Sequence, residues 1–242
     1  MTESVRPERP SERRAAARSS VVWDAVAPVV AGDRDVLDIG GGTGGFAVRV
    51  AAQGNRITVI DPSPDALAAL ARRADEEGVA DRVTGLQGDL GNLRELAPEE
   101  GVDLVLCHGV LGLVDDPAGA LDAIVSVLRP DGALSLLVSQ RHAAVLARAM
   151  AGHFIQASEI LAGEQERGEH RFTAEELAQL LGAAGFTATT THGIRVFADL
   201  VPSSLLDLEP GASAALLELE RAVADRPEYL TLASQLHLVA TR

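Results

Sequence analysis

The fold of this chain is decided by one stretch, Val36-Leu37-Asp38-Ile39-Gly40-Gly41-Gly42-Thr43-Gly44-Gly45. A short apolar run leads into a turn in which four of the five residues from 40 to 44 are glycine. Glycine adopts positive φ freely and lets a ligand approach the backbone without a Cβ in the way. The pattern predicts a strand that turns sharply into a helix, whose first N–H groups are free to bind whatever lies in the turn.

The glycine spacing fits two nucleotide-binding patterns. Gly40, Gly42 and Gly45 match G-x-G-x-x-G, which is typical of dinucleotide sites and suggests an NAD-dependent oxidoreductase. Together with Asp38 and Gly44 the same turn also matches D-x-G-x-G-x-G, the pattern of class I S-adenosylmethionine (AdoMet) methyltransferases. An acid before the first glycine favours AdoMet, because it attracts the α-ammonium group of AdoMet and repels a pyrophosphate. We therefore expect S-adenosyl-L-methionine as the cofactor, bound at this acid and this turn.

Composition narrows the class of protein. The 242 residues suffice for one large domain, and their 47% hydrophobic and 23% charged content is ordinary for a soluble globular chain. No apolar run approaches the ~20 residues of a membrane span, and the polar N-terminus lacks a signal region, so a cytoplasmic protein without membrane partners is expected. The net charge of −14, with no lysine, argues against broad binding to a nucleic-acid backbone without excluding a local basic patch. A single cysteine excludes a disulfide framework, and no Cys/His spacing suits zinc, so we expect no metal.

Apolar periodicity predicts an α/β fold. Strands are expected at 34–39, 56–60, 82–87, 102–107 and 133–139, and helices at 44–53, 64–77 and 117–128. This alternation is typical of a doubly wound parallel sheet. Further strands near 187–191 and 231–241 give a Rossmann-like class I methyltransferase fold: a seven-stranded, mostly parallel sheet with an antiparallel last strand and helices on both faces. We interpret 1–32 as an N-terminal helical arm, 33–242 as a single domain, 152–171 as a lid-like excursion and 192–201 as a linker.

Acidic residues follow the second and third strands. Asp61 lies 21 residues past Gly40, the separation at which nucleoside-binding folds place a carboxylate on the ribose hydroxyls. Asp89 follows the third strand, where an adenine amino group would be recognised. Both therefore join the candidate cofactor site.

Candidate acceptor-binding residues follow later strands. Ligands of open α/β sheets bind beyond the carboxyl ends of the strands, where His108, Arg141 and His142 are expected, with Arg195 as a further candidate. Methyl transfer depends on holding donor and acceptor in line. An anionic acceptor needs no further machinery, whereas a hydroxyl or amine needs a general base.

Several further stretches are distinctive. They are Arg18 five residues before Trp23, His108-Gly109-Val110-Leu111, Asp116-Pro117, Ser126-Val127-Leu128-Arg129-Pro130, Met150-Ala151-Gly152-His153-Phe154, Gly193-Ile194-Arg195-Val196-Phe197-Ala198-Asp199, Leu216-Leu217-Glu218-Leu219-Glu220 and Pro227-Glu228-Tyr229-Leu230-Thr231-Leu232. Over nearly its whole length the chain resembles the bacterial tRNA 5-carboxymethoxyuridine methyltransferases.

The resemblance implies a cofactor site and an acceptor. The AdoMet site would comprise Arg18, Gly40, Gly41, Asp61, Asp89, Leu90 and His108, in addition to the Asp38 and Gly42 of the glycine pattern. Arg18 would reach from the N-terminal helix to the methionine carboxylate. The acceptor would be the carboxylate of a modified wobble uridine in a tRNA anticodon loop, converted to a methyl ester. Arg195 is the candidate for holding it, and Arg195 and His108 are the candidate catalytic residues.

Other functions remain open. Members of that family carry a Lys-rich segment where this chain has the acidic stretch 163–171. A small-molecule carboxylate or hydroxyl is therefore the alternative acceptor. A non-catalytic AdoMet-binding protein is a further alternative, and the sequence does not indicate the oligomeric state.

Overall fold

The computed structural model describes residues 10–97, 100–163, 169–206 and 210–242. Within them a single seven-stranded sheet has the order β3-β2-β1-β4-β5-β7-β6. The strands are β1 (Asp35–Ile39), β2 (Arg56–Asp61), β3 (Val83–Gln87), β4 (Val102–His108), β5 (Leu128–Ser139), β6 (Thr187–Ile194) and β7 (Gln235–Thr241). Strands β1 to β5 pair in parallel, whereas β7 runs antiparallel to both β5 and β6. The predicted fold class is confirmed, including the antiparallel last strand.

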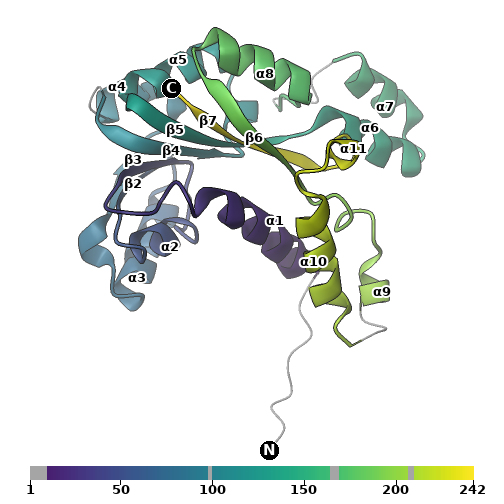
Figure 1. Ribbon diagram of the computed structural model, residues 1–242, viewed down its shortest axis with the longest axis horizontal. Coiled ribbons are helices and arrows are strands. Elements are labelled where there is room, and N and C mark those ends of the chain that lie inside the picture. The colour runs from purple at the N-terminus through teal and green to yellow at the C-terminus, as the bar shows by residue number, and fades with distance from the viewer. Residues whose placement is uncertain (1–9, 98–99, 164–168, 207–209) are drawn as a thin grey trace, which may run out of the picture.

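Helices cover both faces of this sheet (Figure 1). On one face lie α1 (Pro10–Val26), α2 (Ala47–Ala51) and α3 (Pro64–Glu76), and on the other lie α4 (Leu93–Leu96), α5 (Pro117–Val127) and α8 (Ala174–Ala183). Strand β4 is buried at almost every position because side chains on both of its faces enter a core. The sheet is therefore the middle layer of three.

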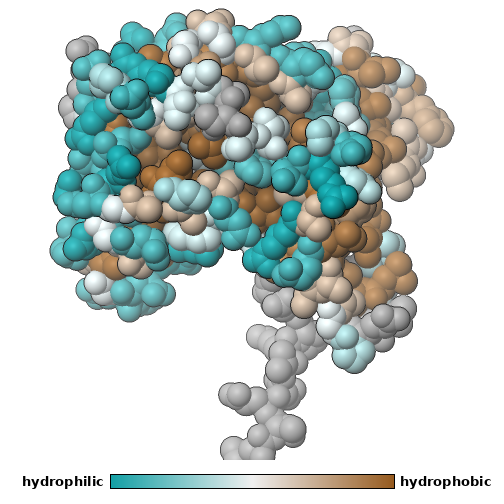
Figure 2. Space-filling model, viewed as in Figure 1, coloured by the Kyte–Doolittle hydropathy of each residue, from teal (hydrophilic) through white to brown (hydrophobic). Residues whose placement is uncertain are grey.

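The remaining helices lie beyond the β5–β7–β6 end of the sheet. They are α6 (Arg141–Met150), α7 (Phe154–Leu161), α9 (Ser203–Leu206), α10 (Ala212–Val223) and α11 (Pro227–Leu230). Helix α7 falls within the predicted excursion at 152–171, of which 164–168 lie outside the described residues, as do residues 1–9 of the predicted arm. Exposed apolar side chains gather on α6 and α7, where Figure 2 shows a brown surface: Met150, Phe154, Ile155 and Leu161.

Two boundaries near the carboxyl ends of the strands differ from the sequence prediction. The helix expected at 44–53 begins only at Ala47, because Gly40, Gly42 and Gly44 all have positive φ and lengthen the turn. The linker expected at 192–201 is strand up to Ile194, because His192 pairs with His237 of β7. Among the described residues, no helix combines the length and apolarity that a membrane crossing requires.

Candidate functional site

The glycine turn after β1 leaves no room for a side chain at Gly40 or Gly41. A Cβ at Gly41 would lie 2.4 Å from Asp38 Oδ2, and one at Gly40, whose φ is +70°, would lie 2.4 Å from Val110 Cγ2. The turn is braced from β2, because the Gly42 N–H donates to Asp61 Oδ2 at 2.9 Å. Asp61 Oδ1 accepts from the N–H of Ser63, the residue that caps α3. The predicted Asp61 thus contacts the glycine turn directly.

Asp38 is a buried acid whose bonding is incomplete. Its residue is 3% exposed, and Oδ2 is buried with no hydrogen-bond partner among the described residues. Burial and the nearby Asp61 raise the pKa of Asp38 to about 7, while Arg18 acts in the opposite direction. A buried carboxylate without a partner is costly, so this position suits a ligand that brings a cation.

Helix α1 carries Arg18 to the same place. Val21, Val22 and Val26 bury the inner face of the helix against the sheet. The Trp23 ring meets the edge of Phe46, which follows the glycine turn, at 5.5 Å between centroids. These contacts fix α1 against the turn. Arg18 consequently lines the turn from the helix side.

A cavity of about 310 Å³ lies between these elements. It is lined by Arg18, Ser19, Val22, Asp38, Gly40, Gly41, Gly45, Phe46, Arg49 and His108. The structure therefore brings together five of the residues that the sequence assigned to the site, from α1, β1, the glycine turn and β4.

Arg195 approaches from the end of β6. Its cation lies close enough to Arg18 to lower the Arg18 pKa, although burial of Arg18 is the larger cause. Arg195 Nη2 contacts Asp199 Oδ2 at 3.4 Å, whereas its Nε is buried without a hydrogen-bond partner within the described part of the chain. The guanidinium group of Arg195 thus lies near that of Arg18, although Arg195 is not among the residues that line the cavity. Such an arrangement suits anions.

His108 ends β4 and belongs to a buried chain of hydrogen bonds. Its Nε2 is 2.8 Å from Ser135 Oγ on β5, which is 2.8 Å from His237 Nε2 on β7. Burial, and then the charge of Arg18, lower the pKa of His108 to about 3. The imidazole is therefore neutral at neutral pH and a weak general base. The sequence prediction missed Ser135 and His237, although both are polar residues at inward positions of apolar strands.

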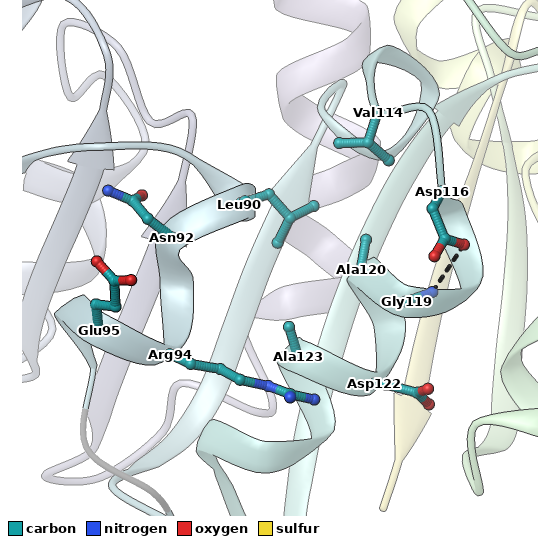
Figure 3. Close-up of a pocket in the computed structure, with 11 residues that line it drawn as sticks. Leu90, Asn92, Arg94, Glu95, Val114, Asp116, Gly119, Ala120, Asp122 and Ala123 are labelled. Carbon is teal, nitrogen blue, oxygen red and sulfur yellow. Dashed lines mark hydrogen bonds between the residues drawn. The ribbon is translucent and has the colours of Figure 1, made fainter.

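Of the two predicted adenine-side residues, Leu90 lines another hollow, of about 650 Å³, and Asp89 directly precedes it. Asp89 caps the short helical turn Leu90–Asn92, and its Oδ1 accepts from the Gly91 N–H at 2.8 Å. Leu90 is buried and lines this hollow, across which the Arg94 side chain extends from α4 toward α5 (Figure 3). Leu90 thus lines a different hollow from Arg18, but its turn adjoins the end of β2, because the Gly88 N–H donates to the Asp61 carbonyl at 3.2 Å.

Two acceptor candidates lie elsewhere. Arg141 Nη1 forms an ion pair with Glu176 Oε1 at 2.7 Å, and its Nη2 donates to the carbonyl of Arg171. His142 is exposed on α6. Neither lines the cavity that contains Arg18 and His108.

Comparison with known proteins finds similarity to methyltransferases. Residues 37–134 match a family model described as a methyltransferase domain. The chain is 29% identical over 232 residues to the tRNA 5-carboxymethoxyuridine methyltransferase of Escherichia coli (strain K12), covering 93% of this chain and 88% of that protein. It is 31% identical over 167 residues to a ubiquinone biosynthesis O-methyltransferase of Xanthomonas euvesicatoria pv. vesicatoria, covering 66% and 65%. The crystal structure of an S-adenosylmethionine-dependent methyltransferase from Mesorhizobium loti has the same fold, with a TM-score of 0.62, 20% identity and coverage of 93% and 100%.

Proposed function

The chain is a class I AdoMet-dependent methyltransferase, and we propose that it methylates a carboxylate, namely that of 5-carboxymethoxyuridine at the wobble position of tRNA. The product would be the methyl ester. The carboxylate assignment comes from the chemistry of the cavity, and the tRNA assignment comes from the E. coli relative.

The residues at the glycine turn fit AdoMet. Asp38 Oδ2 is buried without a partner, which suits the α-ammonium group, and the turn has no space for a side chain at its first two glycines, where a ligand would lie against the backbone. Arg18 would hold the methionine carboxylate, Asp61 the ribose, and the Asp89–Leu90 turn the adenine. When bound, AdoMet supplies an electrophilic methyl group. The protein's own task is to orient the cofactor and exclude water.

The observation that carries the carboxylate assignment is the pairing of arginines with a neutral histidine. Arg195 lies beside Arg18 and has a buried Nε without a partner among the described residues, so it suits a second anion. The pKa of His108, about 3, makes its imidazole unsuited to removing a proton from a hydroxyl or amine. A carboxylate is ionised at neutral pH and needs no proton removed. We assign Arg195 to holding the acceptor and His108 to shaping the cavity as a neutral hydrogen-bonding group.

The tRNA assignment is supported by the extent of the E. coli match. It covers 93% of this chain, far beyond the residues 37–134 that match the domain model, and so includes α1 and Arg195. A small-molecule carboxylate is the second candidate, because the net charge of −14 and the lack of lysine are unfavourable for tRNA.

The test is methyl transfer in vitro. The purified protein is incubated with methyl-labelled AdoMet and tRNA that carries 5-carboxymethoxyuridine, and the nucleosides are analysed by mass spectrometry. We expect labelled methyl ester with the native protein and with Arg72→Ala, whose residue is exposed on α3, and little with Arg195→Ala. A native protein that labels only small carboxylates would favour the second candidate. No label in any carboxylate would contradict both.

A further inference from the structure

Glu220 of α10 is a fully buried carboxylate that binds backbone rather than a cation. Its exposure is 0%, and its oxygens accept three successive backbone hydrogen bonds. The Val196 N–H donates to Oε2 at 2.8 Å, and the N–H groups of Phe197 and Ala198 donate to Oε1 at 2.9 and 2.7 Å. Removing one partner of a buried hydrogen bond leaves the other partner unsatisfied, which is costly. Glu220 therefore holds the segment 196–198 firmly from a helix more than twenty residues later in the chain.

The segment that Glu220 holds begins directly after Arg195. Arg195 has a φ of +58°, a left-handed conformation that residues other than glycine adopt only at a cost. Its carbonyl oxygen accepts from the Ser234 N–H at 3.3 Å, which ties the residue to the start of β7. Surrounding structure must maintain such a conformation, and the three bonds to Glu220 are the contacts that begin at the very next residue.

The charges around Arg195 explain why the backbone that follows it needs the three hydrogen bonds to Glu220. Arg195 and Arg18 lie near enough to repel one another, and Asp199 meets Arg195 only at 3.4 Å. A freely moving segment would let the Arg195 side chain turn away from Arg18. Anchoring the backbone at the next three residues resists that movement without placing a new charge in the cavity.

We propose that Glu220 is a positioning residue for Arg195. By fixing the N–H groups of residues 196–198, Glu220 keeps the Arg195 backbone left-handed and its guanidinium group near that of Arg18. This inference rests on the proposed function in one respect, namely that Arg195 holds the acceptor carboxylate. Glu220 itself touches neither the cavity nor the acceptor.

The matched variants are Glu220→Gln and Glu218→Gln. Glu218 lies on the same helix but is exposed, and its carboxylate bonds Arg221. In Glu220→Gln an amide NH₂ replaces one acceptor oxygen and faces a backbone N–H. We expect the KM for tRNA carrying 5-carboxymethoxyuridine to rise about tenfold, because a buried N–H loses its acceptor, with the Kd for AdoMet and kcat within about twofold of native. Glu218→Gln should match the native protein.

A double variant separates positioning from general destabilisation. If Glu220 acts through Arg195, adding Glu220→Gln to Arg195→Ala leaves kcat/KM where Arg195→Ala alone puts it. If the two losses add, or if Glu220→Gln lowers the thermal midpoint and leaves KM unchanged, the proposal is overturned.

Amide hydrogen exchange of the native protein tests the proposal even if Glu220→Gln fails to fold. In the native protein the amides of Val196, Phe197 and Ala198 should exchange as slowly as those of β7. Exchange as fast as in exposed turns would overturn the proposal without any variant. If the native protein methylates no tRNA, the acceptor assignment fails, whereas the exchange rates still decide whether Glu220 holds the segment.

Discussion

Binding of AdoMet should release a proton from Asp38 in mildly acidic solution. In the free protein, burial and Asp61 raise the pKa of Asp38 to about 7. A ligand ammonium group beside Oδ2 would favour the ionised form and lower this pKa toward the ordinary aspartate value of 3.8. A return of the Asp38 pKa to its ordinary value would be a change of about three pKa units, or ~4 kcal/mol. This is the largest free energy by which ionisation of Asp38 can favour AdoMet binding.

The direction with pH follows from the same shift. Because the folded-state pKa of Asp38 lies above its unfolded value, the contribution of Asp38 to stability is complete below about pH 4 and is lost as the pH rises through about 7. The free protein should therefore lose stability over that interval relative to Asp38→Asn. Bound AdoMet should restore this stability. The Kd for AdoMet should fall by up to about tenfold per pH unit as the pH rises from about 5 to about 6.5.

The measurement is isothermal titration calorimetry at pH 6 in two buffers with different ionisation enthalpies. The difference between the observed enthalpies should correspond to release of about one proton in the native protein. The amino group of AdoMet is already protonated at that pH and contributes nothing. Asp65→Asn, at an exposed residue of α3, should behave like the native protein. Binding of AdoMet without proton release by the native protein would refute the assignment of Asp38 to the ammonium group.

Three further outcomes are expected. Arg18→Ala should raise the Kd for AdoMet about tenfold or more, corresponding to roughly 1.5–3 kcal/mol for a bond to a charged group, and an unchanged Kd would remove Arg18 from the site. Gly41→Ala should weaken AdoMet binding with the circular dichroism spectrum retained, because its Cβ would lie 2.4 Å from the neighbouring carboxylate, whereas Gly182→Ala, with open space in α8, should bind normally. Ser135→Ala should lower the free energy of unfolding by about 1–3 kcal/mol in urea, because it leaves His237 without its buried partner, and unchanged stability would show that this bond is dispensable.

The fold was largely predictable because its signals are local. Buried parallel strands are short apolar runs, as in β4, and a helix cap such as Ser63 follows β2. The prediction was wrong for a boundary that is set by pairing across the sheet. Strand β6 continues through His192 to Ile194 because β7 lies beside it, and the sequence around 192 carries no sign of that partner.

The residues of the candidate site also divide into those with a local sequence signal and those that depend on distant partners. Asp38 and the glycines were predictable because a single stretch of chain contains them. His108 was predicted from its place at the end of a strand and also through the family resemblance, whereas Arg18 was identified through that resemblance alone. Ser135 and Glu220 were missed, because their bonds join residues 102 and 22 to 24 positions apart that meet only once the sheet is assembled. A polar residue inside an apolar strand or helix face is the one available signal, and it does not identify the partner.

The charges of the candidate site suit a zwitterion and, under the proposed function, an anionic acceptor. Asp61 makes ionisation of its neighbour Asp38 less favourable, and Arg195 makes protonation of Arg18 less favourable. Both like-charged pairs therefore weaken the free protein, and ligands of opposite charge relieve them. The ammonium and carboxylate of a methionine moiety match one member of each pair, which leaves Arg195 for an acceptor carboxylate. On this reasoning, a neutral amide analogue of the acceptor should lose binding in the native protein and lose little in Arg195→Ala.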